Sequence, residues 1–197
     1  FRSLSAETPL ILNGDTVDPG DWKHLSAGDR ALVDRIRDES LRRSVIWITG
    51  NHDPKPQFEN SGRIQFMSQF RVEKRLLVLH GHGFPGDWSF FRSLIRFLRI
   101  LHRFYIGLGA QPLHPARYAK KWPIIYRYLT ASVMVHALEL ARKEGFPAVV
   151  CGHTHGHADV TVDGIRYLNP GAWTETPVYC LFLTPHDIVL EKVEDVL

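Results

Sequence analysis

The chain has 197 residues, of which 44% are apolar, enough to bury the core of one globular domain. No stretch reaches the roughly 18 uncharged residues that a membrane-spanning helix needs, and no charged-then-apolar leader opens the chain. We therefore expect a single domain over residues 1–197, without a membrane span or an export signal. The formal net charge of +3 leaves phosphate, nucleic acid and membrane surfaces open as anionic partners.

The two cysteines are too few for a disulfide framework. Cys151 and Cys180 each lie beside an apolar run, where a reduced thiol inside the core is the ordinary expectation. Cys151 directly precedes Gly152, but its apolar surroundings favour a buried thiol over a nucleophile. A reducing compartment, and hence a cytoplasmic location, follows from this pattern.

Four apolar, β-rich runs end abruptly in clusters of glycine and polar residues. Buried parallel strands feeding loops have this pattern, and open α/β sheets bind ligands beyond the carboxyl ends of their strands. We therefore expect the four clusters to share one site. The runs with their clusters are 10–12 before Asn13-Gly14-Asp15, 45–48 before Gly50-Asn51-His52-Asp53, 76–79 before His80-Gly81-His82, and 148–150 before Gly152-His153-Thr154-His155.

The other segments predict an amphipathic crossover helix, a helix at the end of an aromatic, arginine-rich region, and a C-terminal set of hairpins. Residues 29–39 carry Leu32 and Ile36 at i, i+4 and fit an amphipathic helix between the first two strands. A second helix, with apolar residues in register from 129 to 140, should end at Gly145. The short β-branched runs 160–162, 164–168, 178–183 and 187–193 favour antiparallel hairpins.

Residues 84–140 interrupt the strand pattern with an aromatic, arginine-rich stretch that we interpret as a helical insertion. Its arginines fall at i, i+4, i+7 and i+11, a basic stripe against a broad apolar surface. A helix packed on the core with its arginines in solvent explains this pattern. So does an interfacial helix that meets anionic lipid headgroups. The four arginines are Arg92, Arg96, Arg99 and Arg103.

The polar clusters supply oxygen and imidazole ligands, which suit divalent Mn, Fe and Zn alike. A lone Asn-His-Asp is usually only a turn, but four such clusters in order are a strong signal. Adjacent glycines allow a strand to turn sharply beside an ion. The candidate ligands are Asp15, Asn51, His80, His153 and His155, whereas His82 and His157 adjoin motif histidines and are weaker candidates.

The order Gly-Asp-x-x-Asp, Gly-Asn-His-Asp, His-Gly-His and Gly-His-Thr-His resembles the calcineurin-like metallophosphoesterase family. The resemblance implies an α/β fold, a four-layer αββα sandwich, and two divalent metal ions. It makes Asp15 the bridging ligand, His155 a ligand of the first metal, and His52 the residue that faces the phosphoryl oxygens and assists the leaving group. Asn51, His80 and His153 would join Asp15 at the second metal. Two-metal hydrolysis of a phosphate ester or anhydride is the implied reaction.

The family's Asp-x-His motif has no counterpart before Asp15, so the first metal site is incomplete. We expect either that further residues precede Phe1 in the natural protein, or that the protein is a one-metal or inactive relative. Asp18 and Asp53 are better candidates for orienting ligands or His52 than for binding metal directly.

Within the family, the place and length of the insertion resemble the lipid-substrate cap of the UDP-2,3-diacylglucosamine hydrolase branch. The segment 169–175 resembles that branch as well, although His52 stands where its best-known members carry Arg, and His82 where they carry Asp. We expect hydrolysis of a phosphodiester or pyrophosphate bond in a UDP-sugar lipid, at the inner membrane face. The alternatives are a phosphodiesterase or phosphatase of soluble nucleotides and a binding relative without catalysis. Nucleic acid is not expected as a partner, and the oligomeric state is left open.

Overall fold

The computed structural model describes residues 5, 8–17, 25–53, 61–84, 100, 104, 107 and 123–193. Three parallel strands form the first sheet, in the order β1 (Leu10–Asn13), β2 (Val45–Ile48) and β3 (Gln65–Met67). β1 and β2 are joined through the helix α1 (Ala27–Ser40). β2 is buried along its whole length, as its unbroken run of apolar residues predicts.

The inner face of α1 differs slightly from its prediction. Ile36 packs in the core as expected, but its partner there is Val33, and Leu32 is 38% exposed. Leu32 and Val33 precede Ile36 by four and three residues, and both spacings put a residue on the same side of a helix as Ile36. In the fold it is Val33 that packs in the same cluster as Trp47 of β2. Ser26 begins the helix through a reciprocal capping box with Asp29.

The second sheet has five strands in the order β4 (Gln69–Val72), β5 (Leu76–Leu79), β6 (Ala148–Val150), β8 (Ile165–Asn169) and β7 (Ala158–Val162). β5, β6 and β8 are parallel, and the two edge strands are antiparallel to their neighbours. Asp163 and Gly164, both at positive φ, make the tight turn from β7 to β8. β9 (Val178–Leu183) and β10 (Ile188–Val193) form a separate antiparallel hairpin.

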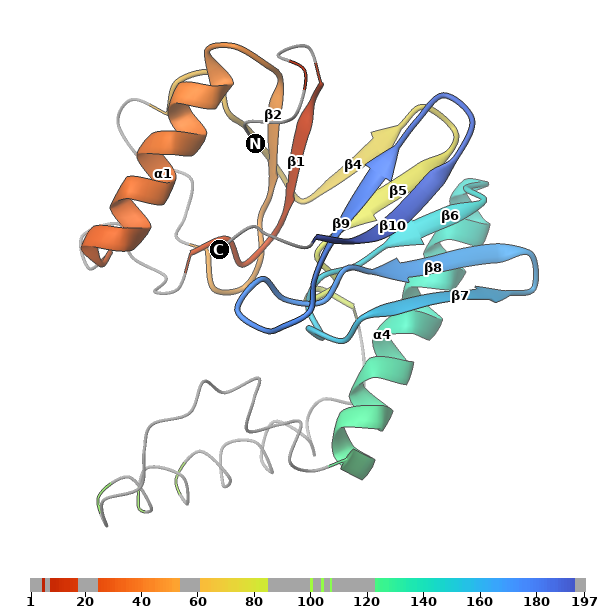
Figure 1. Ribbon diagram of the computed structural model, residues 1–197. Helices are drawn as coiled ribbons and strands as arrows, with labels where there is room; N and C mark the ends of the chain where they lie inside the picture. The colour runs from red at the N-terminus through yellow and green to blue at the C-terminus, as the bar shows by residue number, and fades with distance from the viewer. Residues whose placement is uncertain are drawn as a thin grey trace.

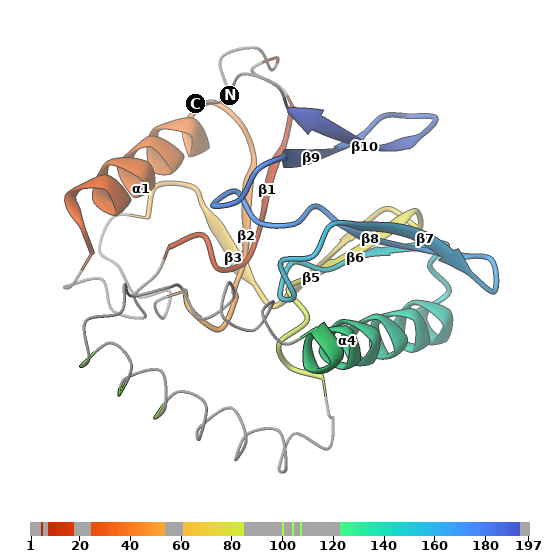
Figure 2. The ribbon, with the colours of Figure 1, turned by 60° about the horizontal axis from the view of Figure 1, so that its bottom comes forward.

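Three apolar clusters separate four layers, and the predicted αββα sandwich is confirmed (Figures 1 and 2). One cluster lies between α1 and the first sheet. A second, which includes Ile48 and Val78, joins the first sheet and the β9–β10 hairpin to the second sheet. The third lies between the second sheet and helix α4 (Pro123–Glu144). The two sheets therefore face each other, with a helix outside each.

Helix α4 ends where it was predicted to end, at Gly145 with φ +75°. Its second half packs on β6 and β8 through Val133, Ala137, Leu138 and Ala141, so this part of the predicted insertion belongs to the core. The arginines of the insertion, Arg92, Arg96, Arg99 and Arg103, lie outside the described residues, and the boundary 84–140 stays a prediction. None of the described helices is both long and apolar enough to cross a bilayer.

Candidate metal centre

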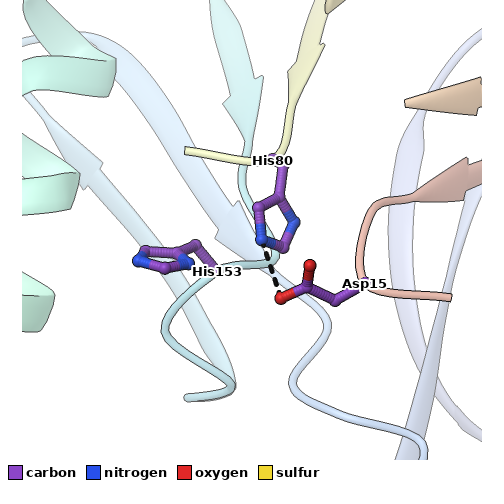
Figure 3. Close-up of side chains that lie close together, drawn as sticks. All are labelled: Asp15, His80 and His153. Carbon is purple, nitrogen blue, oxygen red and sulfur yellow. Dashed lines mark ion pairs between the residues drawn. The ribbon is translucent and has the colours of Figure 1, made fainter. Parts of the chain in front are cut away.

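Polar side chains from both sheets converge beyond the carboxyl ends of their strands (Figure 3). Asp15 follows β1, His80 follows β5 and His153 follows β6. The two sheets face each other, so the loops after β1 and β2 meet those after β5 and β6. The ligand atoms of Asp15, His80 and His153 all lie within 4.8 Å of one another. These three residues form a group that can hold a metal ion.

His80 lies at the middle of this group and is only 2% exposed. Its Nδ1 lies 2.9 Å from the carbonyl oxygen of Asn13, which can only accept, so Nδ1 donates a proton there. Its Nε2 faces Oδ2 of Asp15 at 3.1 Å and Oδ1 of Asn51 at 3.3 Å. A nitrogen lone pair beside two oxygens requires a proton or a cation between them. This arrangement fits a metal ligand.

His153 fits the same role. Among the described residues, its buried Nδ1 has no hydrogen-bond partner. Burial, followed by the charge of nearby His80, lowers the pKa of His153 to about 4. The imidazole is therefore neutral at physiological pH, which is the form that binds metal ions. A buried nitrogen that the protein leaves unpaired is expected where an ion completes the site.

Asp15 is ionised in this setting. Burial raises the pKa of its carboxyl group, but the hydrogen bond with His80, the positive charge of that ring and the backbone N–H of His52 outweigh burial and bring the pKa to about 2. The His52 N–H donates to Oδ1 of Asp15 over 2.7 Å. Asp15 itself has φ +48°, a region that non-glycine residues rarely adopt.

The carboxylate of Asp53 holds the Asp15 loop in place. Its Oδ2 accepts the backbone N–H groups of Asp15 and Gly50, both over 2.8 Å. Its Oδ1 accepts those of Thr16 over 2.7 Å and Val17 over 3.3 Å. One side chain thus ties the loop after β1 to the loop after β2. Hydrogen bonds to a charged acceptor are among the stronger ones, so this anchor can sustain the unusual backbone at Asp15.

Glycine is required at two positions because a candidate ligand lies against the backbone there. A Cβ at Gly50 would overlap the carboxylate and backbone nitrogen of Asp15, and one at Gly14 would overlap the ring of His80. A third close approach occurs at Gly152, where a Cβ would lie 2.7 Å from the carbonyl oxygen of Asn13. A side chain at any of these positions would displace a ligand-bearing loop.

The loop that carries His153 and His155 is hydrogen-bonded to the backbone of His80, another candidate ligand. The backbone N–H groups of Gly152 and His153 both donate to the carbonyl oxygen of His80, over 3.1 and 3.0 Å. Within the loop, the N–H of His155 donates to the Gly152 carbonyl over 3.0 Å, and His155 has φ +53°. His80 therefore fixes this loop through its backbone while its ring faces Asp15.

Residues 2–157 match the family model described as calcineurin-like phosphoesterase, which is most of the chain. The chain belongs to the calcineurin-like phosphoesterase family. Membership supports a general assignment as a metal-dependent phosphoesterase that acts on a phosphorylated substrate. It also agrees with the divalent-metal dependence typical of the family and with the ligand group around His80.

No curated protein sequence matches the chain closely. Among solved structures, a single mutant of Vps29 from Entamoeba histolytica is similar with a TM-score of 0.40 and 15% identity, covering 94% of this chain and 97% of that chain. The Vacuolar Protein Sorting 29 structure from Cryptosporidium parvum is similar with a TM-score of 0.36 and 14% identity, covering 94% of this chain and 95% of that chain.

The other residues that the sequence suggested for the site differ in how close they lie to Asp15, His80 and His153. His52 is half-buried beside Asp15, and His155 is half-buried in the loop after His153. The ring of His82 lies 5.3 Å from that of His80 and 6.4 Å from that of His153, whereas His157 stacks on Tyr179 at 3.9 Å. Asp18 lies outside the described residues.

The cysteine prediction is confirmed for Cys151, which is free and completely buried. Burial raises the pKa of its thiol far above the ordinary value, so it remains protonated and inert. Cys180 is also free but only half-buried.

Among the described residues, Tyr126 and Asn169 contact the site but were not predicted as part of it, whereas Asn13 lies in a predicted polar cluster without an assigned role. The carbonyl oxygen of Asn13 holds the ring of His80. The hydroxyl group of Tyr126 and the amide of Asn169 both bond Thr154, inside the Gly-His-Thr-His loop. Asn169 opens an Asn-Pro-Gly sequence that reads as a turn, and only its complete burial shows another use. No local pattern marks Tyr126.

Proposed function

We propose that the chain hydrolyses a phosphodiester or pyrophosphate bond with divalent metal ions held by Asp15, Asn51, His80 and His153. The observation that carries the proposal is the convergence of Asp15, His80 and His153 within 4.8 Å, with the Asn51 oxygen 3.3 Å from His80. A divalent cation bound there supplies Lewis acidity and an activated water for attack on phosphorus. Mn, Fe and Zn suit this donor set equally.

The residues of the chain divide the remaining work. Asp15, ionised because of its low pKa, offers a permanent negative charge to the cation, and the ring of His153, neutral because of its low pKa, offers a nitrogen lone pair. The Nε2 of His80, which faces the Asp15 carboxylate, would be the other nitrogen ligand. His52 directly follows the ligand Asn51, and its N–H is bonded to Asp15. We assign its ring to the phosphoryl oxygens, where it stabilises developing charge or protonates the leaving oxygen.

The site of the other metal, the first metal of the family, would be formed by Asp15 and His155. These two ligands leave that site incomplete. For the substrate we propose a pyrophosphate-linked UDP-sugar lipid at an anionic membrane surface, supported only by the basic stripe Arg92, Arg96, Arg99 and Arg103 in the sequence. A soluble nucleotide would suit the same centre.

Hydrolysis should require both the metal and Asp15. Purified protein stripped with a chelator should cleave bis(p-nitrophenyl) phosphate or UDP-glucose only after Mn²⁺ is restored. Asp15→Asn should lower kcat/KM at least about 100-fold, because a key ligand loses its charge. The matched control is Asp163→Asn, whose exposed side chain pairs with Arg142 far from the ligands and should leave the rate unchanged. Tight Mn²⁺ binding without turnover of either substrate would instead identify a binding relative.

The lipid substrate needs its own comparison. Rates on UDP-2,3-diacylglucosamine in mixed micelles and on UDP-glucose in solution should be measured before and after Arg92, Arg96, Arg99 and Arg103 are replaced by Glu. Selective loss of the lipid rate supports the lipid proposal. Equal rates on the lipid before and after the replacement would contradict it and leave the soluble substrate.

A further inference from the structure

The backbone of the loop 152–157 is in an unfavourable conformation at a proposed ligand. His155 has φ +53°, in the left-handed region, where a non-glycine residue is uncommon. Such a conformation persists only when the surrounding contacts determine it, because it is energetically unfavourable for a residue that carries a Cβ. The contacts that hold the loop therefore also determine where its histidine side chains lie.

Thr154, the residue between the two histidines, is held from two directions. The hydroxyl group of Tyr126, near the start of α4, donates to the Thr154 carbonyl oxygen over 3.0 Å. The Nδ2 of Asn169, at the end of β8, donates to the Thr154 hydroxyl over 2.9 Å. Asn169 is completely buried, and its Oδ1 accepts the N–H of Gly171 over 2.9 Å, so its amide is fixed. The Tyr126 bond acts on the peptide group that leads directly into His155.

The loop also approaches Tyr126 more closely than a side chain would allow. A Cβ at Gly156 would overlap the hydroxyl oxygen of Tyr126, while the next nearest atoms are Cζ of Tyr126 at 3.5 Å and a methyl carbon of Thr130 at 3.9 Å. Among the described residues, the only atom that a Cβ at Gly156 would overlap is thus the hydroxyl oxygen of Tyr126. Tyr126 itself is half-buried, and burial raises the pKa of its hydroxyl group, with the charge of Glu175 as a further cause. It therefore remains a donor at neutral pH.

We propose that Tyr126 is a positioning residue of the candidate metal centre, which holds the His153–His155 loop in its binding geometry through the Thr154 carbonyl. This inference rests on the proposed metal-dependent function. Tyr126 would act through the Thr154 carbonyl rather than by binding the cation or the substrate. It ties the loop of the proposed histidine ligands to α4, and a Cβ at position 156 would overlap its hydroxyl group.

The test measures metal binding without substrate. Cation affinity should be determined by Mn²⁺ calorimetry, and ligand geometry by the visible absorption of the Co²⁺ form, for Tyr126→Phe and for its matched control Tyr128→Phe. Tyr128 lies on the same helix and is 54% exposed. We expect Tyr126→Phe to raise the Mn²⁺ dissociation constant about ten-fold and to change the Co²⁺ spectrum, as loss of supporting contacts around metal ligands does. Equal affinities and spectra for the two variants would overturn the proposal.

A double-mutant cycle separates positioning from a general loss of stability. Gly156→Ala alone should weaken Mn²⁺ binding, because its methyl group displaces the Tyr126 hydroxyl. In the Tyr126→Phe background the obstructing oxygen is absent, so the same substitution should weaken binding little further. Additive effects of the two substitutions would contradict the proposal even if each variant alone were impaired.

The two proposals fail in different ways. Wild-type protein that binds neither Mn²⁺ nor Co²⁺ would defeat the proposed function and the positioning role together. Wild-type protein that binds the cation, with Tyr126→Phe indistinguishable from Tyr128→Phe, would defeat the positioning role alone. Where turnover is measurable, Tyr126→Phe should lower kcat with little change in KM, since we assign this residue to the metal-binding loop and not to the substrate.

Discussion

The two halves of the sandwich supply different candidate ligands and hold them by different means. The half built from β1, β2 and α1 contributes the candidate oxygen ligands Asp15 and Asn51, and a charged side chain, Asp53, fixes their loops through four backbone N–H groups. The half built from β5, β6 and α4 contributes the imidazoles of His80 and His153. Neutral groups hold the loop there: the His80 carbonyl, Tyr126 and Asn169.

This difference predicts unequal sensitivity to substitution. A carboxylate that accepts four hydrogen bonds concentrates the support of one half in a single side chain, and bonds to a charged acceptor are roughly twice as strong as neutral ones. On the imidazole side, several neutral contacts share the support. Removing one of these contacts should make the loop more mobile, while the others still hold it in place.

The largest effect should follow Asp53→Ala. Four backbone N–H groups would lose a charged acceptor, and solvent replaces it only partly because the site is half-buried. We expect a loss of about 4 kcal/mol in the free energy of unfolding, measured by urea denaturation, together with weaker Mn²⁺ binding. Asp34→Ala on the exposed side of α1 is the control and should cost little. A loss of stability as small as that of Asp34→Ala would contradict the proposed difference in support between the two halves.

A smaller effect should appear in the pH dependence of the metal-free protein. The pKa of His153 is about 4 when folded and has an ordinary value of 6.5 when unfolded. Between these values the unfolded chain binds the proton and the folded chain does not, so stability should fall as the pH drops from 6.5 to 4. The loss should reach about 3 kcal/mol. His153→Asn should flatten the profile in this window, and His186→Asn, at an exposed position, should not. Identical profiles for both variants would contradict the assignment.

The smallest expected effect concerns the close packing of the oxygen side. Gly50→Ala places a methyl group against the carboxylate of Asp15 and should weaken Mn²⁺ binding about ten-fold, by displacing one ligand of the set. Gly83→Ala provides the matched control, because a Cβ at Gly83 meets no atom of the described residues within 4 Å. Calorimetry of both variants checks the prediction. An equal response would mean that the backbone at Gly50 yields without moving Asp15.

The sequence was sufficient for elements that rest on local pattern. The apolar runs at β1, β2, β5 and β6 became strands at the predicted places, and the Asp-Gly pair at 163–164 became a hairpin turn. β3 and β4 were not predicted. β3 has only three residues, and β4 alternates polar and apolar residues over only four, from Gln69 to Val72, so each gives a weak local signal.

What could not be predicted depends on tertiary packing. Tyr126 reaches Thr154 across 28 residues because α4 lies against the second sheet, and no spacing in the sequence encodes that contact. Similarly, Asn169 reads as part of a turn until β8 buries it beneath Thr154. The ligand motifs are visible in the sequence, whereas the residues that support them become visible only in the fold.

The candidate ligands differ in how far they are exposed to solvent. His80 is only 2% exposed, Asp15 and His153 are half-buried, and Asn51 is exposed. A cation held by this set would have a one-sided coordination shell, with protein below and solvent above. Its remaining coordination positions would point outward, where water and an incoming phosphate can compete for them, as in metal sites that keep an open position for chemistry.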